Sequence, residues 1–208
     1  NCMEEKNINE KESLELISQM IQSTKEYIEV GNGNQFLYWG YFTAALAVVV
    51  EVVYNMTESR HSGWLWMLMF VFWIFMAIIN RRKHYAVKTY TNKVVNHVWY
   101  VIGSIFIVTS VVIFTLAIVY NHYKSLDLMM PLSAIYVGIG VSMTGIIVQN
   151  RWIANLPFFG IGIGLYMLTA LYLNIPSSIS WNLLFGLSFI ITMAVPGHIL
   201  NKKEKKEC

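Results

Sequence analysis

The sequence predicts an all-α, polytopic membrane protein with six transmembrane helices and an N-terminal amphipathic helix in the cytosol. The chain of 208 residues is 56% hydrophobic and only 13% charged, which is about half the charged share of a soluble domain. A membrane-crossing helix needs about 17 to 25 mostly apolar residues. Six stretches meet that length, and polar or turn-forming residues separate them: Phe36 to Tyr54, Gly63 to Ile79, Val98 to Tyr120, Leu128 to Gln149, Trp152 to Leu173 and Ser180 to Leu200.

The sequence divides into three parts, which are an acidic arm (residues 1–35), the membrane domain (residues 36–200) and a basic tail (residues 201–208). In the arm, a helix is expected from about Glu10 to Val30. Its apolar side chains recur at helical spacing and form one stripe, which consists of Leu14, Ile17, Ile21 and Ile28.

The arm carries seven Glu and three Lys, whereas a helix that binds an anionic membrane surface is rich in Lys and Arg. We therefore expect the stripe to dock on the basic loop between spans two and three, residues 81–97. Pairing with the arm of a second copy, or with a foreign partner, is one alternative, and a solvated face on a loosely held helix is another. The basic loop itself reads as an extension of the third span into the cytosol.

Proline and small residues predict how the last three spans pack. Pro131 lies in the first turn of span four, where a missing N–H is harmless, while Pro157 and Pro196 are expected to kink spans five and six. Small residues allow close helix approach in lipid. They form ladders in spans four and five, which predicts a tight hairpin of these two helices: Ala134, Gly138 and Ser142, then Gly160 and Gly164.

The spans contain two further patterns. The glycine series Gly160, Gly162 and Gly164 lacks the preceding strand that a nucleotide-binding fingerprint requires, so it indicates packing. Spans three and six share a spacing of Gly, Phe, Ile, Thr and Val that begins at Gly103 and at Gly186. An inverted repeat of three helices plus three helices, as in some transporters, would explain that echo.

The distribution of Lys and Arg predicts the orientation in the membrane. Ten of these residues fall on the side that holds the basic loop, Arg151 and the tail, and only Arg60 and Lys124 fall on the other side. Basic loops remain in the cytoplasm. Both termini are therefore expected to be cytosolic.

Polar residues in or near the spans are the candidate functional residues. Glu51 is the one clear ionisable residue inside a span, and such residues often serve in ion or proton pathways. It lies near the predicted outer surface, where water or a lipid headgroup could solvate it, and Tyr or Asn side chains at the outer rim are alternative partners. At the cytosolic ends, a basin for an anionic headgroup would combine Asn80, Arg81, Gln149, Asn150, Arg151, Asn155 and His198. Ordinary positive-inside anchoring is the alternative reading of the basin.

No recognised catalytic or metal-binding pattern occurs in the sequence. The histidines lack HxxxH or HExxH spacing within a span, and no nucleophile elbow is present. Neither a cofactor, a metal nor a nucleic-acid partner is predicted, and an enzymatic activity is not expected.

Three short stretches resemble small, uncharacterised multi-span inner-membrane proteins of bacteria. They are residues 36–41 (FLYWGY), 138–145 and 196–201 (PGHILN), together with residues 17–21 in the arm. The resemblance covers nearly the whole chain and implies a bacterial inner (plasma) membrane, without an established activity.

These patterns favour a non-enzymatic regulatory or interaction module that contacts a partner through its arm and basic loop. The alternative is a small transporter or channel, possibly dimeric, with a path along spans four to six and Glu51. A lipid-acting enzyme at the cytosolic basin has the weakest support. The expected partners are the lipid bilayer, an anionic headgroup, and a protein partner or second copy.

Overall fold

The computed structural model describes residues 14–20, 32–57, 60–82, 90–175 and 180–207. Residues 14–20 are helical, and the elements that follow are α2 (Asn32–Thr57), η1 (Arg60–Met67), α3 (Leu68–Arg82), α4 (Tyr90–Val119), η2 (Tyr123–Leu128), α5 (Met129–Ile147), α6 (Arg151–Asn155), α7 (Pro157–Tyr172), α8 (Ser180–Phe189), η3 (Ile190–Ala194) and α9 (Val195–Glu207). The described residues contain no strand, so the predicted all-α class is confirmed.

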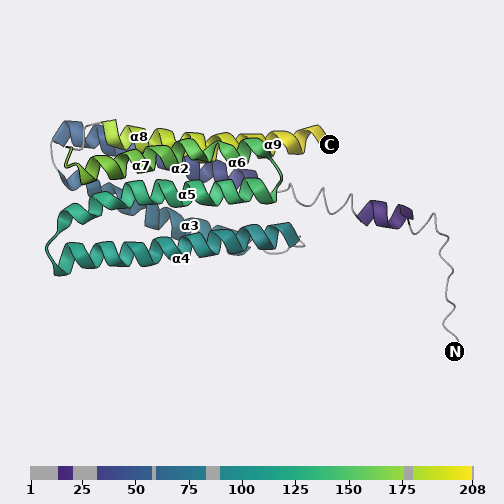
Figure 1. Cartoon of the computed structure of the whole chain (residues 1–208), viewed down its shortest axis with the longest axis horizontal. Helices are drawn as coiled ribbons and strands as arrows, with labels where there is room; N and C mark the ends of the chain where they lie inside the picture. Colours follow the sequence, from purple (N-terminus) through teal and green to yellow (C-terminus); the bar gives the residue numbers. More distant parts are fainter. Residues whose placement is uncertain (1–13, 21–31, 58–59, 83–89, 176–179, 208) are drawn as a thin grey trace, which may run out of the picture.

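Six helical segments among the described residues are long and apolar enough to cross a membrane. They are Gly33–Thr57, Ser62–Ile79, Thr91–Val119, Tyr123–Ile147, Arg151–Tyr172 and Trp181–Lys202. These segments lie side by side, and α2 begins at the same end of the bundle at which α9 ends (Figure 1). This arrangement is the one that an even number of crossings requires. Which end faces the cytosol stays a prediction.

Two of the spans are far less enclosed than the others. In the apolar stretch of the second span (α3), only 11% of the residues are buried, and in that of the third span (α4), 17% are buried. In the sixth span the share is 56%. The centre of the bundle is instead built from α2, α5, α7 and the composite helix α8–η3–α9. α4 begins at Tyr90, within the basic loop, so this span extends beyond its apolar stretch.

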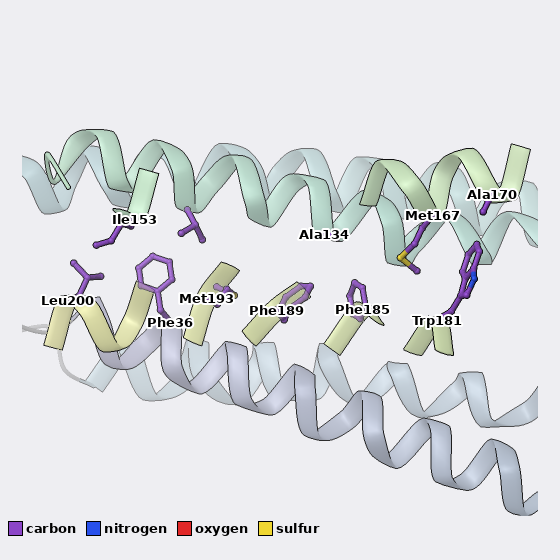
Figure 2. Close-up of a cluster of buried hydrophobic side chains, with 11 residues drawn as sticks. Phe36, Ala134, Ile153, Met167, Ala170, Trp181, Phe185, Phe189, Met193 and Leu200 are labelled. Carbon is purple, nitrogen blue, oxygen red and sulfur yellow. The ribbon is translucent and has the colours of Figure 1, made fainter. Parts of the chain in front are cut away.

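The main core cluster lies between α5 to α7 on one side and α2 with α8–α9 on the other. Figure 2 shows Phe185, Phe189 and Met193 in a row along the last span, directed toward α5 and α7. Ile153 and Met167 face them and are both 0% exposed. Helices in lipid associate by close van der Waals packing, because the surrounding acyl chains are as apolar as the side chains.

Glycines set the spacing of α5 and α7. A Cβ on Gly138 would lie 2.5 Å from Ile161 Cγ1, and one on Gly164 would lie 2.9 Å from the carbonyl oxygen of Pro131. Gly160 has a different partner, because its Cβ would meet the Thr192 side chain on η3. The second predicted ladder therefore has two roles, with Gly164 against α5 and Gly160 against the last span.

Helices α5 and α7 end in the same way, with a left-handed residue that is not glycine. Gln149 has φ 55° and Asn174 has φ 51°. After α5, the N–H of Asn150 donates to the carbonyl of Gly145 at 2.9 Å, and after α7, the N–H of Ile175 donates to the carbonyl of Ala170 at 3.0 Å. These bonds close Schellman motifs, which satisfy the last helical carbonyls.

The two prolines predicted to kink spans five and six lie where the helix changes. Pro157 is the first residue of α7 and follows the short α6, so its missing N–H breaks no bond inside α7. Pro196 follows the π-helical turn η3, in which the Val195 N–H donates to the Ile190 carbonyl. A π turn widens the helix by one residue, which makes room for the proline ring.

Of the predicted arm helix, the structure describes residues 14–20, which are helical. Leu14 and Ile17 are exposed there, whereas Ile21 and Ile28 lie outside the described residues, as do positions 83–89 of the basic loop. Docking of the arm on this loop therefore stays a prediction.

Candidate functional site

Glu51 lies on the inside of the bundle, about 9 Å along α2 from its last residue, Thr57. Its side chain is only 4% exposed. Asn182 on α8 donates from Nδ2 to Glu51 Oε2 at 2.9 Å. The expectation that water or a headgroup solvates this carboxyl is wrong, because α2 and α8 bury it; the alternative that the sequence left open, an Asn partner, is what the structure shows.

The second oxygen of Glu51 has no hydrogen-bond partner among the described residues. Oε1 is buried, and no hydrogen-bond donor reaches it within the part of the chain that the structure describes. An isolated carboxylate in an apolar interior is unfavourable by many kcal/mol, far more than one neutral hydrogen bond offsets. The Glu51 site is therefore the one place in the described bundle where a buried acid meets only a neutral partner.

A second unpaired polar atom lies at the same end of the bundle. The indole nitrogen of Trp66 on η1 is buried without an acceptor among the described residues. The Trp66 ring packs edge-on against Phe185 with ring centroids 5.2 Å apart, and Phe185 lies one helical turn after Asn182. Asn182 and Trp66 were missed by the sequence analysis, although both lie at the end of their spans that corresponds in depth to Glu51.

Ser142, from the first small-residue ladder, also carries a buried hydroxyl without a partner in the described structure. The hydroxyl of Thr144, two residues further along α5, both donates and accepts a hydrogen bond. Thr144 Oγ1 donates to the Gly140 carbonyl at 2.8 Å and accepts from Trp99 Nε1 at 3.2 Å, which joins α4 to α5.

The residues proposed for a cytosolic basin have different surroundings. Asn150 caps α6, because its Oδ1 accepts from the N–H groups of Trp152 and Ile153 at 3.0 and 3.4 Å. Gln149, Arg151 and Asn155 are exposed. The side chains of Asn80 and Arg81 lie outside the described set, so whether these residues form an anion site stays a prediction.

His198 joins α9 to the first span. Its Nε2 lies 2.7 Å from the hydroxyl of Tyr41, and one turn further along, Asn201 Nδ2 donates to Asn34 Oδ1 at 2.7 Å. The backbones approach closely here, since a Cβ on Gly197 would lie 2.9 Å from the Gly33 carbonyl oxygen. Side-chain hydrogen bonds and close backbone packing thus join the first part of α2 to α9.

An open apolar groove runs along the outer face of α7 beside α8. Its lining residues are Phe158, Phe159, Gly162, Ile163, Tyr166 and Leu184. Gly162, the middle glycine of the series in span five, has open space where a Cβ would be. Because the groove belongs to the membrane-length part of the helices, acyl chains would fill it in a bilayer.

Comparisons with protein families, with curated protein sequences and with solved structures found no match for this chain. The described residues also contain no group of three or more His, Cys, Asp or Glu side chains placed to hold a metal ion.

Proposed function

We propose that the protein is a non-enzymatic, multi-pass membrane protein of the bacterial inner membrane that binds a partner protein through its cytosolic arm and basic loop. The observation that carries this proposal is the exposure of large apolar side chains outside the six membrane-length helices. Leu14, Leu16, Ile17 and Met20 are 66%, 53%, 52% and 61% exposed.

These four side chains occupy one side of the helix. At 100° per residue they fall within an arc of about 160°, and Glu15, Ser18 and Gln19 occupy the opposite side. An apolar face of this kind gains about 25 cal/mol for each Å² that a partner removes from water. The acidic character of the arm selects a partner whose groove is apolar at its centre and basic at its rim.

The test is site-specific photocross-linking in native membranes, with the photoreactive residue at Ile17 or, as the matched control, at Glu15 on the opposite side. We expect position 17 to form an adduct with a separate protein and position 15 to form none. The adduct at position 17 should be lost when Leu14 and Ile21 are replaced by Ser, while the protein keeps its elution volume on size exclusion.

Mass spectrometry of the adduct decides between the alternatives. A cross-link from position 17 only to phospholipid, or only to residues 81–97 of the same chain, would contradict partner binding. In the second case the arm would be a structural element that docks on its own basic loop.

A small transporter or channel is the second candidate, and one observation favours it. Glu51 is a buried acid in a membrane-length helix, and among the described residues it hydrogen-bonds to the one span that contains a π-helical turn. π turns inside α-helices are frequent at functional sites. The path would run beside α8–η3–α9.

A further inference from the structure

We propose that Glu51 is the binding site of a small, exchangeable monovalent cation, either a proton or an alkali metal ion. This inference does not depend on the arm or on its partner. It rests on the burial of Glu51, which is only 4% exposed, on the neutral character of its neighbour Asn182, and on Oε1, which has no hydrogen-bond partner among the described residues.

A charged carboxylate at position 51 needs a positive charge nearby. Asn182 supplies one amide hydrogen bond to Oε2. One neutral hydrogen bond contributes far less than it costs to leave a charged carboxylate otherwise unpaired in the bundle. A cation on Oε1 removes that imbalance.

No described side chain of the elements around α2 supplies a fixed positive charge to Glu51. The elements packed against α2 are η1, α3, α8, η3 and α9, and Trp99 of α4 meets Phe36 near the start of α2. The titratable residues of α3, Arg81 and Arg82, are its last two, at the opposite end of the helix from η1, and those of α4 lie in its first three turns.

The sequences of α8 and η3 contain no titratable residue. On η1, Arg60 and His61 are the titratable residues, and their side chains lie outside the described set.

The titratable residues of α9 lie at the far end of the bundle. His198, the nearest of them along the last span, is 16 residues from Asn182, which corresponds to about 24 Å of helix. Tyr54 is the titratable neighbour on α2 itself, one turn after Glu51, and it is partly exposed. None of the described side chains near Glu51 therefore carries the positive charge that its carboxylate would need.

The packing around Glu51 limits the size of the cation. Gly186 on α8 lies against Ala47 and Ala44 of α2, where an added Cβ would be 2.9 Å from the Ala47 Cβ. The two helices are in backbone-level contact one turn from the Glu51–Asn182 pair. Such packing admits a single small ion at the carboxyl and excludes a bulky organic cation.

The test uses the hydrophobic reagent dicyclohexylcarbodiimide on the purified full-length protein in proteoliposomes. The reagent adds to a protonated carboxylic acid, and the resulting O-acylisourea rearranges to a stable N-acylurea with no leaving group. Peptide mapping then locates the adduct. We expect it on Glu51 at acidic pH, and we expect its yield to fall as the pH is raised.

Two arms distinguish the sources of positive charge. If the site takes an alkali ion, Na⁺ or K⁺ at constant pH will protect Glu51 from the reagent, relative to choline. If the site takes only a proton, the yield will follow the pH and ignore the salt. A yield that depends on neither, or the absence of a Glu51 adduct at every pH, would overturn the proposal.

Two variants complete the design. Glu51→Gln keeps the shape of the side chain and should lose the adduct, while Asp127→Asn, an exposed acid at the same end of the bundle, should leave the Glu51 adduct unchanged. Peptide mapping of the unmodified sequence gives the answer even if Glu51→Gln fails to fold.

Discussion

Gly145→Ala is expected to unfold the hairpin of spans four and five. A Cβ at this position would lie 2.3 Å from the backbone nitrogen of Ala154 and 2.5 Å from the carbonyl carbon of Ile153. These are backbone atoms, so no side-chain rotation relieves the overlap. Overpacking of this severity costs about 3 kcal/mol or more, and it separates α5 from α6.

The matched control is Gly162→Ala in α7, which adds the same methyl group where nothing lies within 4 Å. Its stability should be unchanged, or raised by up to about 1 kcal/mol because alanine is the better helix former. Unfolding in mixed micelles, followed by circular dichroism against the mole fraction of dodecyl sulfate, compares the two variants. Equal midpoints for Gly145→Ala and Gly162→Ala would contradict the described contact of α5 with α6.

Met167→Ala is expected to destabilise the bundle strongly. Met167 is 0% exposed and points from α7 toward the last span, near Trp181 (Figure 2). Truncating a buried Met leaves a cavity that the surrounding helices fill only in part, which costs about 2 to 5 kcal/mol. The same micelle titration measures the loss.

Leu165→Ala on the same helix is the control, because Leu165 is 53% exposed and would face lipid. Acyl chains refill the space that this truncation leaves, so a change of about 0.5 kcal/mol or less is expected. If Leu165→Ala destabilised the protein as much as Met167→Ala, the face of α7 toward α8 would not be the buried one.

The spans could be predicted from the sequence because length and hydropathy determine them. For example, the fourth span was expected from Leu128 to Gln149, and its helix runs from Met129 to Ile147, with Gln149 as the left-handed residue that closes it. The closing residue itself was not foreseen, since Gln is not a typical left-handed residue. The left-handed conformation of Gln149 accompanies the two hydrogen bonds that end the helix, from Gln149 N–H to the Ile146 carbonyl and from Asn150 N–H to the Gly145 carbonyl.

The environment of Glu51 could not be predicted in the same way. Hydropathy places a residue at a depth in the membrane, but it does not say which way the residue faces. The burial of Glu51 depends on α8 packing against α2, where Ala47 and Gly186 allow close approach, and that contact joins residues far apart in the chain. Asn182 was missed for the same reason, because a single Asn near the end of a span is typical of an interfacial residue.

The π turn was also beyond sequence reasoning. Pro196 predicts that the helix must adapt, and the sequence allows either a kink or a widened turn. The structure has the widened turn. Within it, the Thr192 hydroxyl donates to the Ser188 carbonyl at 2.8 Å. Whether spans three and six form a true inverted repeat stays a prediction.

If six helices cross the membrane and the basic loops stay in the cytosol, both ends of the chain are cytosolic. Labelling with a membrane-impermeant maleimide tests it, on variants that carry one cysteine each after Cys2 and Cys208 are replaced by Ser. The three positions are exposed in the structure: Ser18→Cys before the first span, His122→Cys between spans three and four, and Lys202→Cys at the end of the sixth.

The account predicts that intact cells are labelled at position 122 alone, and that inverted membrane vesicles are labelled at positions 18 and 202 alone. Labelling of positions 18 and 202 from opposite faces would mean an odd number of crossings. Labelling of both from outside the cell would reverse the orientation, and either result would contradict the account.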